Sequence, residues 1–305
     1  MRISTSTIYD MGVARITELQ TRLAKTQQQL ATGRRILTPA DDPVAAARVL
    51  DVNQELAINT QLSRNRATAV SLLNRVEGTL SSVSDIIENV KELIVRAGNP
   101  TLSDHERGFL AVELQGTFDD LLAFANTKDA SGDYLFSGYK VTAQSFTATT
   151  AGADYNGDRG QRMIQVGPSR EIAVSETGET VFRGGGQDLF NTISDLIAVL
   201  KSPASSPAQV SALNAGLATA NGEINKALDN VLTVRASIGS RLKELDALDS
   251  AGRVLDEHYQ QTLGGLQDVD YAEAISRLSQ DKLTLEASQR SFVSVASLSL
   301  FNYLS

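Results

Sequence analysis

The chain has 305 residues, of which 42% are hydrophobic and 21% charged, so most of it can fold and there is room for two or more domains. It has no cysteine, which excludes disulfides and thiolate metal sites, and its formal net charge of −8 argues against nucleic acid as the main partner. Low aromatic content and only six prolines favour long helices over a thick globular core.

The first residues do not resemble a secretory signal peptide. Arg2 is followed by polar residues, and no apolar core precedes Asp10. No uninterrupted apolar run reaches membrane-spanning length. We therefore expect no membrane partner, and we expect any export to occur without a cleaved signal.

Narrow apolar stripes with coiled-coil spacing occur at both ends of the chain. Stripes this narrow need a partner helix, which is the other end of the chain, a neighbouring copy, or both. The first 35 residues are net basic and residues 265–305 are net acidic, which suits pairing of the two ends. We predict an assembly seam between subunits; the alternative is a core within one chain. The predicted seam consists of Ile16, Leu19, Leu23 and Leu30 in a helix over residues 7–32, and of Leu278, Leu285 and Phe292 near the end.

Gly33 is a typical end for the first helix, and the segment that follows has the signals of a helix start. Asp42 fits the N-cap position and Pro43 the first helical position. Asp41 and Asp42 can also be read as a metal-binding or acid–base pair. Adjacent carboxylates converge poorly, so we favour the capping interpretation.

The strongest periodicity follows in the next helix, which ends at Gly98–Pro100. Apolar residues step by four and three without a break, which predicts the core of a helical bundle. They are Ala69, Leu73, Val76, Leu80, Val83, Ile87, Val90 and Ile94. A third helix starts at Ser103 or Asp104, with a predicted core face of Phe109, Val112, Phe118, Leu121, Leu122 and Ala125.

Residues 132–186 have a different texture and hold ten of the 22 glycines. We predict a separate β-rich unit with a hairpin turn at Asn156-Gly157. The strand candidates are Tyr134–Tyr139, Arg162–Val166, Glu171–Val174 and Thr180–Phe182.

Helical periodicity resumes at Asp188, breaks at Pro203 and restarts at Ser206-Pro207. Gly264-Gly265 is predicted to separate this body from the last helix. The predicted fold class is mainly α, with terminal coiled-coil helices, a long-helix bundle and a small β-rich inserted outer domain. The predicted domains are residues 1–43 with 265–305, residues 44–131 with 187–264, and residues 132–186.

No residues form a recognisable catalytic, cofactor-binding or metal motif. The only histidines, His105 and His258, lie outside any motif that pairs a base with a nucleophile or metal. Gly184-Gly185-Gly186 lacks the Lys-Ser/Thr of a phosphate loop. We therefore predict a protein that is not an enzyme and binds no cofactor or metal.

Seven segments along the chain carry a resemblance to a known family: Met1–Ser6, Gln27–Ile36, Pro39–Pro43, Tyr134–Gly138, Val234–Leu242, Asp270–Leu278 and Ser297–Leu304. By these segments the chain resembles the bacterial flagellin family along its whole length. Within that family the Ile3–Ser6 opening with Tyr9, Asp41-Asp42-Pro43 and the Asn302–Ser305 ending are more similar to the proteins of the hook–filament junction than to filament flagellins.

The resemblance implies a structural subunit of the extracellular flagellum that joins the hook to the filament. Implied partners are further copies of the chain in a ring, hook-associated protein 1, flagellin, and an export chaperone at the C-terminal region. It also implies export by the flagellar type III apparatus. A short flagellin is the alternative, and a secreted adhesin or effector is a more distant one.

Overall fold

The computed structural model describes residues 5–304, so the Met1–Ser4 part of the resemblance and Ser305 lie outside the described residues. By residue contacts the chain divides into a terminal unit, up to Asn59 and from Val254 onward, and a central unit, Thr60–Arg253. The helices are α1 (Thr5–Thr32), α2 (Pro43–Ala97), α3 (Asp104–Ala125), α4 (Gly178–Phe182), α5 (Leu189–Lys201), α6 (Pro207–Gln267), α7 (Tyr271–Leu304) and the 3-10 helix η1 (Gly184–Gly186). The strands are β1 (Phe146–Thr149), β2 (Gly152–Tyr155), β3 (Met163–Gly167) and β4 (Arg170–Ala173).

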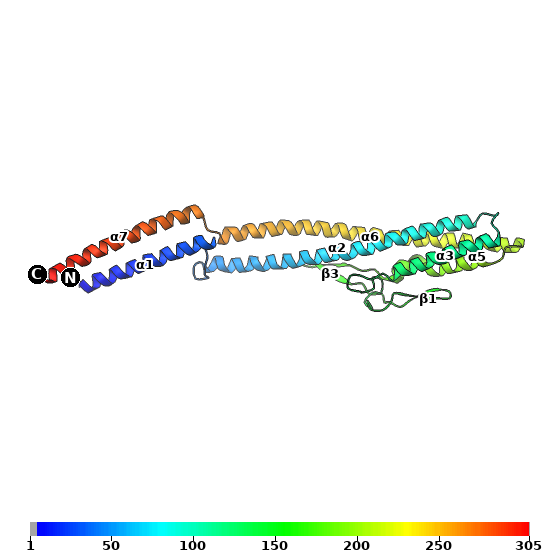
Figure 1. Cartoon of the computed structure of the whole chain (residues 1–305), viewed down its shortest axis with the longest axis horizontal. Coiled ribbons are helices and arrows are strands. Elements are labelled where there is room, and N and C mark those ends of the chain that lie inside the picture. The colour runs from blue at the N-terminus through cyan, green and yellow to red at the C-terminus, as the bar shows by residue number, and fades with distance from the viewer. Residues whose placement is uncertain (1–4, 305) are drawn as a thin grey trace. The chain divides into compact units, whose positions relative to one another are not determined.

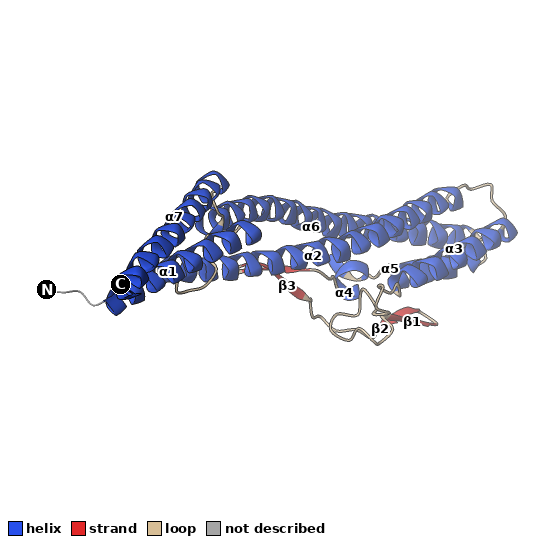
Figure 2. Cartoon of the chain, turned by 60° about the vertical axis from the view of Figure 1, so that its left-hand side comes forward, coloured by secondary structure: helices blue, strands red, loops and turns tan. Residues whose placement is uncertain are grey.

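The expected fold class is confirmed, since long helices dominate and the strands form only two small antiparallel hairpins, β1–β2 and β3–β4 (Figure 2). The two units divide inside α2 and α6, whereas the sequence places domain boundaries at residues 43/44 and 264/265. Residues 132–186 belong to the central unit. The three-part division stays a prediction.

In the terminal unit, α1 and α7 lie side by side and antiparallel (Figure 1). The end of α1 and the end of α6 meet where Arg34 and Asp268 face each other in an antiparallel bridge. Gly264-Gly265 was expected to separate the body from the last helix. Both glycines lie inside α6, which continues to Gln267, and the break before α7 lies at residues 268–270.

The core of the central unit is built on α2. All eight residues of the predicted stripe from Ala69 to Ile94 are buried, as the period of three and four predicts. Phe118 of α3 meets Phe190 of α5 edge to face at 5.7 Å. The core face predicted for α3 was wrong at two positions. Phe109 is 61% exposed and Val112 is 68% exposed. Phe118, Leu121 and Ala125 are buried as predicted, whereas the first half of α3 buries Leu110 and Leu114 instead.

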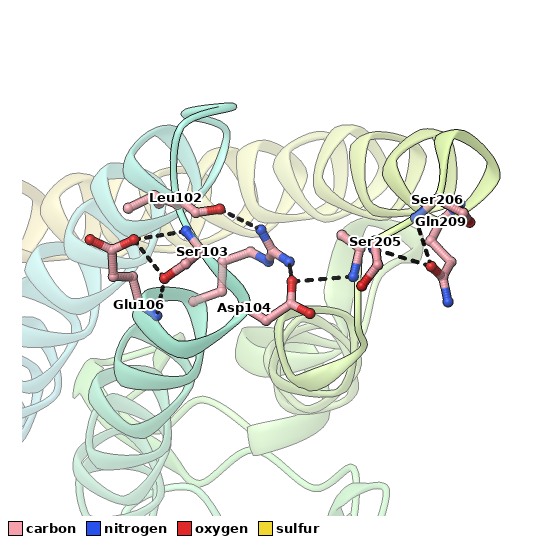
Figure 3. Close-up of polar contacts among 9 residues, drawn as sticks. Leu102, Ser103, Asp104, Glu106, Ser205, Ser206 and Gln209 are labelled. Atoms are coloured by element: carbon pink, nitrogen blue, oxygen red, sulfur yellow. Dashed lines mark hydrogen bonds and ion pairs between the residues drawn. The ribbon is translucent and has the colours of Figure 1, made fainter.

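The turn between α2 and α3 is fastened by side chains of the first turn of α3 (Figure 3). Ser103 is the N-cap, and it forms a reciprocal capping box with Glu106. Asp104 pairs with the buried Arg107 and accepts a hydrogen bond from the Ala204 N–H at 3.3 Å. One carboxylate thereby ties the α2–α3 turn to the α5–α6 turn.

Aromatic residues of the β segment pack against the helical core. Phe146 of β1 and Phe182 of α4 are fully buried, and their rings lie 4.8 and 5.6 Å from the ring of Phe190 in α5. The β3–β4 hairpin is fastened to α6 by a two-point ion pair between Arg170 and Glu244 at 2.6 and 2.8 Å. The segment therefore shares its core with the bundle.

Two of the strand candidates were wrong. Tyr134–Tyr139 forms turns with one isolated bridge, and Thr180–Phe182 lies in α4. A strand would place Val181 and Phe182 on opposite faces, but both are fully buried, which one helical turn allows. Asn156-Gly157 was expected to form a hairpin turn but follows β2, and the turn lies between Thr149 and Gly152.

Candidate assembly site

The predicted seam residues lie on α1 and α7 of the terminal unit. Leu19 is 1% exposed, and the other six are half-buried within the single chain. The chain thus covers part of both stripes itself, by pairing its own two ends. The half-buried residues are Ile16, Leu23 and Leu30 on α1, and Leu278, Leu285 and Phe292 on α7.

Close approach of α1 and α7 near the chain ends depends on a glycine that the sequence analysis did not single out. The rings of Tyr9 and Phe292 are 5.1 Å apart. A Cβ on Gly12 would lie 2.5 Å from the Phe292 ring, so any larger residue would push the ring away. A glycine within a helical pattern is the only signal of this contact in the sequence.

Apolar side chains remain exposed on the outer surfaces of the terminal unit. Three of them on α7 are Ile275, Leu283 and Val293, which are 54%, 69% and 66% exposed. Met11 on α1 is 55% exposed. Exposed apolar side chains that together form a contiguous patch are typical of a surface that another protein covers.

The connection between α1 and α2 is organised by the two neighbouring aspartates. Asp42 directly precedes α2, and its Oδ1 accepts a hydrogen bond from the Ala45 N–H at 3.0 Å, while Pro43 is the first helical residue. Asp41 instead accepts from the side chain of Lys25 at 2.5 Å and from the Thr38 N–H at 2.9 Å. These bonds, that from Lys25 above all, lower the pKa of the Asp41 carboxyl to about 2.

A short clamp joins the two connections of the terminal unit. We define it as residues 33–35, after α1, and residues 267–269, between α6 and α7. The Arg35 N–H donates to the Gln267 carbonyl at 2.6 Å, and the Val269 N–H donates to the Gly33 carbonyl at 2.9 Å. Gly33 has a φ of 70° and a Cβ there would lie 3.0 Å from the Tyr271 hydroxyl, so both backbone and space favour glycine.

The described residues contain no group of three or more His, Cys, Asp or Glu that could hold a metal ion. His105 packs edge-on against Phe109 with the ring centroids 4.6 Å apart. None of the helices within residues 5–304 has the length and apolar character needed to span a bilayer.

Comparison with known proteins agrees with this architecture. A family model of the bacterial flagellin N-terminal helical region matches residues 3–141. Flagellar hook-associated protein 3 of Salmonella typhimurium is 36% identical over 317 residues, which cover 99% of each chain. A flagellin of Salmonella derby is 23% identical over 78% of this chain but only 50% of its own length. A solved structure of hook-associated protein 3 from Legionella pneumophila, 23% identical, superposes with a TM-score of 0.67 over 70% of this chain and 98% of that one.

The fold, with its paired terminal helices, is of the flagellin type. With 36% identity over the full length, the chain belongs to the family of flagellar hook-associated protein 3. The family resemblance predicted from the sequence motifs is confirmed.

Proposed function

We propose that the chain is a structural subunit that joins the flagellar hook to the flagellin filament. The full-length match to flagellar hook-associated protein 3 carries this proposal, because the match to flagellin spans only half of the flagellin chain. The subunit contacts hook-associated protein 1 on the hook side and flagellin on the filament side, in a ring of its own copies.

The exposed apolar residues of α7 support an assembly role. Ile275, Leu283 and Val293 are more than half exposed, and a neighbouring subunit would remove them from water. Before assembly the same surface requires protection, which fits an export chaperone bound at the C-terminal region. The protein acts outside the cell, as a structural part of the flagellum.

Complementation of a strain that lacks its own hook-associated protein 3 tests the proposal. Expression of this chain should restore swimming and should reduce the flagellin shed into the medium, because filaments need a junction on which to grow. Immunogold labelling should then mark one band at the base of each filament. Label along the whole filament would instead show that the chain is a short flagellin. If swimming is not restored and the label lies elsewhere on the cell, the result would favour a secreted adhesin or effector.

A further inference from the structure

The heptad spacing of α7 specifies the register of the α1–α7 pair only weakly. Leu278, Leu285 and Phe292 recur at intervals of seven, so a slip that brings Leu285 to the place of Phe292 also brings Leu278 to the place of Leu285. Within the seam, the contact of Phe292 with Gly12 opposes this slip, but a smaller leucine also fits beside a glycine. Coiled coils resolve this ambiguity with a polar contact that occurs only once. The clamp is such a contact, because its pairing of residues 33–35 with 267–269 is polar and does not repeat.

Arg35 makes the clamp's bond to Gln267 and three further contacts around the clamp. Its Nη2 donates to the Leu266 carbonyl at 2.9 Å, and its Nη1 lies 3.4 Å from Oδ2 of Asp42. Its own carbonyl accepts from Nε2 of Gln29, a side chain that is only 7% exposed, at 2.6 Å. One residue therefore connects the end of α1, the start of α2 and the end of α6.

We propose that Arg35 is a positioning residue for assembly: through the clamp it selects one register of α1 against α7, and the pair enters the flagellum in that register. The slip by seven residues is excluded because it would separate Arg35 from Leu266 and Gln267 and leave those carbonyls unpaired. The part of this inference that concerns assembly rests on the proposed function, while the register itself is a property of the chain alone.

The absence of cysteine from the chain allows a direct measurement of the clamp. Arg34 and Asp268 form a non-hydrogen-bonded antiparallel pair, for which a Cα separation of about 4.5 Å is typical and is within disulfide range. In the dilute full chain, Arg34→Cys with Asp268→Cys should oxidise at least about tenfold faster than the control Arg34→Cys with Asp270→Cys, which is two residues out of register. Equal oxidation rates for the two cysteine pairs would show that residues 33–35 and 267–269 are not paired as the clamp requires.

A second pair of cysteines reports the register. Tyr9→Cys with Phe292→Cys tests the observed register, and Tyr9→Cys with Leu285→Cys tests a slip of one heptad. Arg35→Ala should raise the ratio of slipped to observed cross-link roughly tenfold, the effect of losing about 1.4 kcal/mol of preference. The matched control Arg48→Ala removes an exposed charge from α2 and should leave the ratio unchanged. An unchanged ratio in Arg35→Ala, or loss of both cross-links together, would refute a role in register.

The swimming assay tests the consequence for assembly. Cells that carry the Arg35→Ala variant should swim poorly. Adding Arg34→Cys with Asp268→Cys to this variant should restore swimming in oxidising medium but not in the presence of a reductant. Normal swimming of Arg35→Ala, or failure of the oxidised clamp to restore it, would overturn the assembly part. If the unaltered chain itself does not restore swimming, the proposed function fails while the cross-link ratio still decides the register.

Discussion

Asp41 shows how a single carboxylate stabilises an irregular connection in the terminal unit. It accepts hydrogen bonds from Lys25, from the Thr38 N–H and from the Leu37 N–H. Its pKa falls from 3.8 to about 2, chiefly because of Lys25. Because the folded pKa lies below the ordinary value, Asp41 stabilises the fold above about pH 4, and this stabilisation is lost as the pH falls towards 2.

Lys25→Ala tests that assignment. It should raise the pKa of Asp41 towards 3.8, with a small depression remaining from the two backbone N–H donors. Carboxyl-detected NMR titration measures the change directly. Lys282→Ala, which removes the same charge from α7, should leave the Asp41 titration in place; an equal rise in both variants would mean that Lys25 makes no specific contact.

Burial along the α2 stripe can be tested with two valines of the same helix. Val83 is fully buried and Val95 is 75% exposed. Val83→Asp would bury an unpaired charge at a cost of several kcal/mol, which should lower the melting temperature of the central unit by roughly 10 °C or more. Val95→Asp should change it by little, as surface substitutions usually do. Similar melting curves for the two variants would place Val83 at the surface.

The coupling of the β segment to the bundle makes a prediction opposite to that of a separable domain. Phe146 contacts Phe182 and Phe190 in one aromatic cluster, so Phe146→Ala should destabilise the helices by about 3–5 kcal/mol. Met163→Ala in β3, where the side chain is 51% exposed, is the matched control. Thermal unfolding followed by circular dichroism at 222 nm measures the stability of the helices. An unchanged transition in Phe146→Ala would mean that the β segment is an independent unit.

For the whole molecule, folding and assembly are predicted to depend on different faces of α7. Leu285→Asp with Phe292→Asp should loosen α1 against α7, which hydrogen exchange of residues 16–30 measures. The melting temperature of the central unit should stay the same, because its core includes neither residue. Leu283→Asp with Val293→Asp should keep the α1–α7 pair and yet abolish swimming, since those side chains are exposed. Normal swimming of the second variant would mean that the face of α7 with Leu283 and Val293 is not part of the interface between subunits.

The sequence by itself determined the features that depend on neighbours within a few turns. The stripe from Ala69 to Ile94 is buried because the period of a helix alone places it on one face. Helix starts follow local capping chemistry: Ser103 caps α3, Asp188 caps α5, and Pro207 begins α6. The family resemblance is likewise carried by contiguous residues.

The tertiary structure alone decided which of several competing apolar residues are covered and which chain segments meet. Leu110 is buried and Phe109 is exposed because α5 packs on one side of α3. The helical periodicity of the sequence does not show which side a neighbouring helix covers. Gly264-Gly265 stays helical although two glycines cost about 1 kcal/mol each, since the end of α6 is held by Arg35 from 231 residues away. Contacts between residues so far apart in the sequence depend on how the whole chain folds back. No local sequence pattern predicts them.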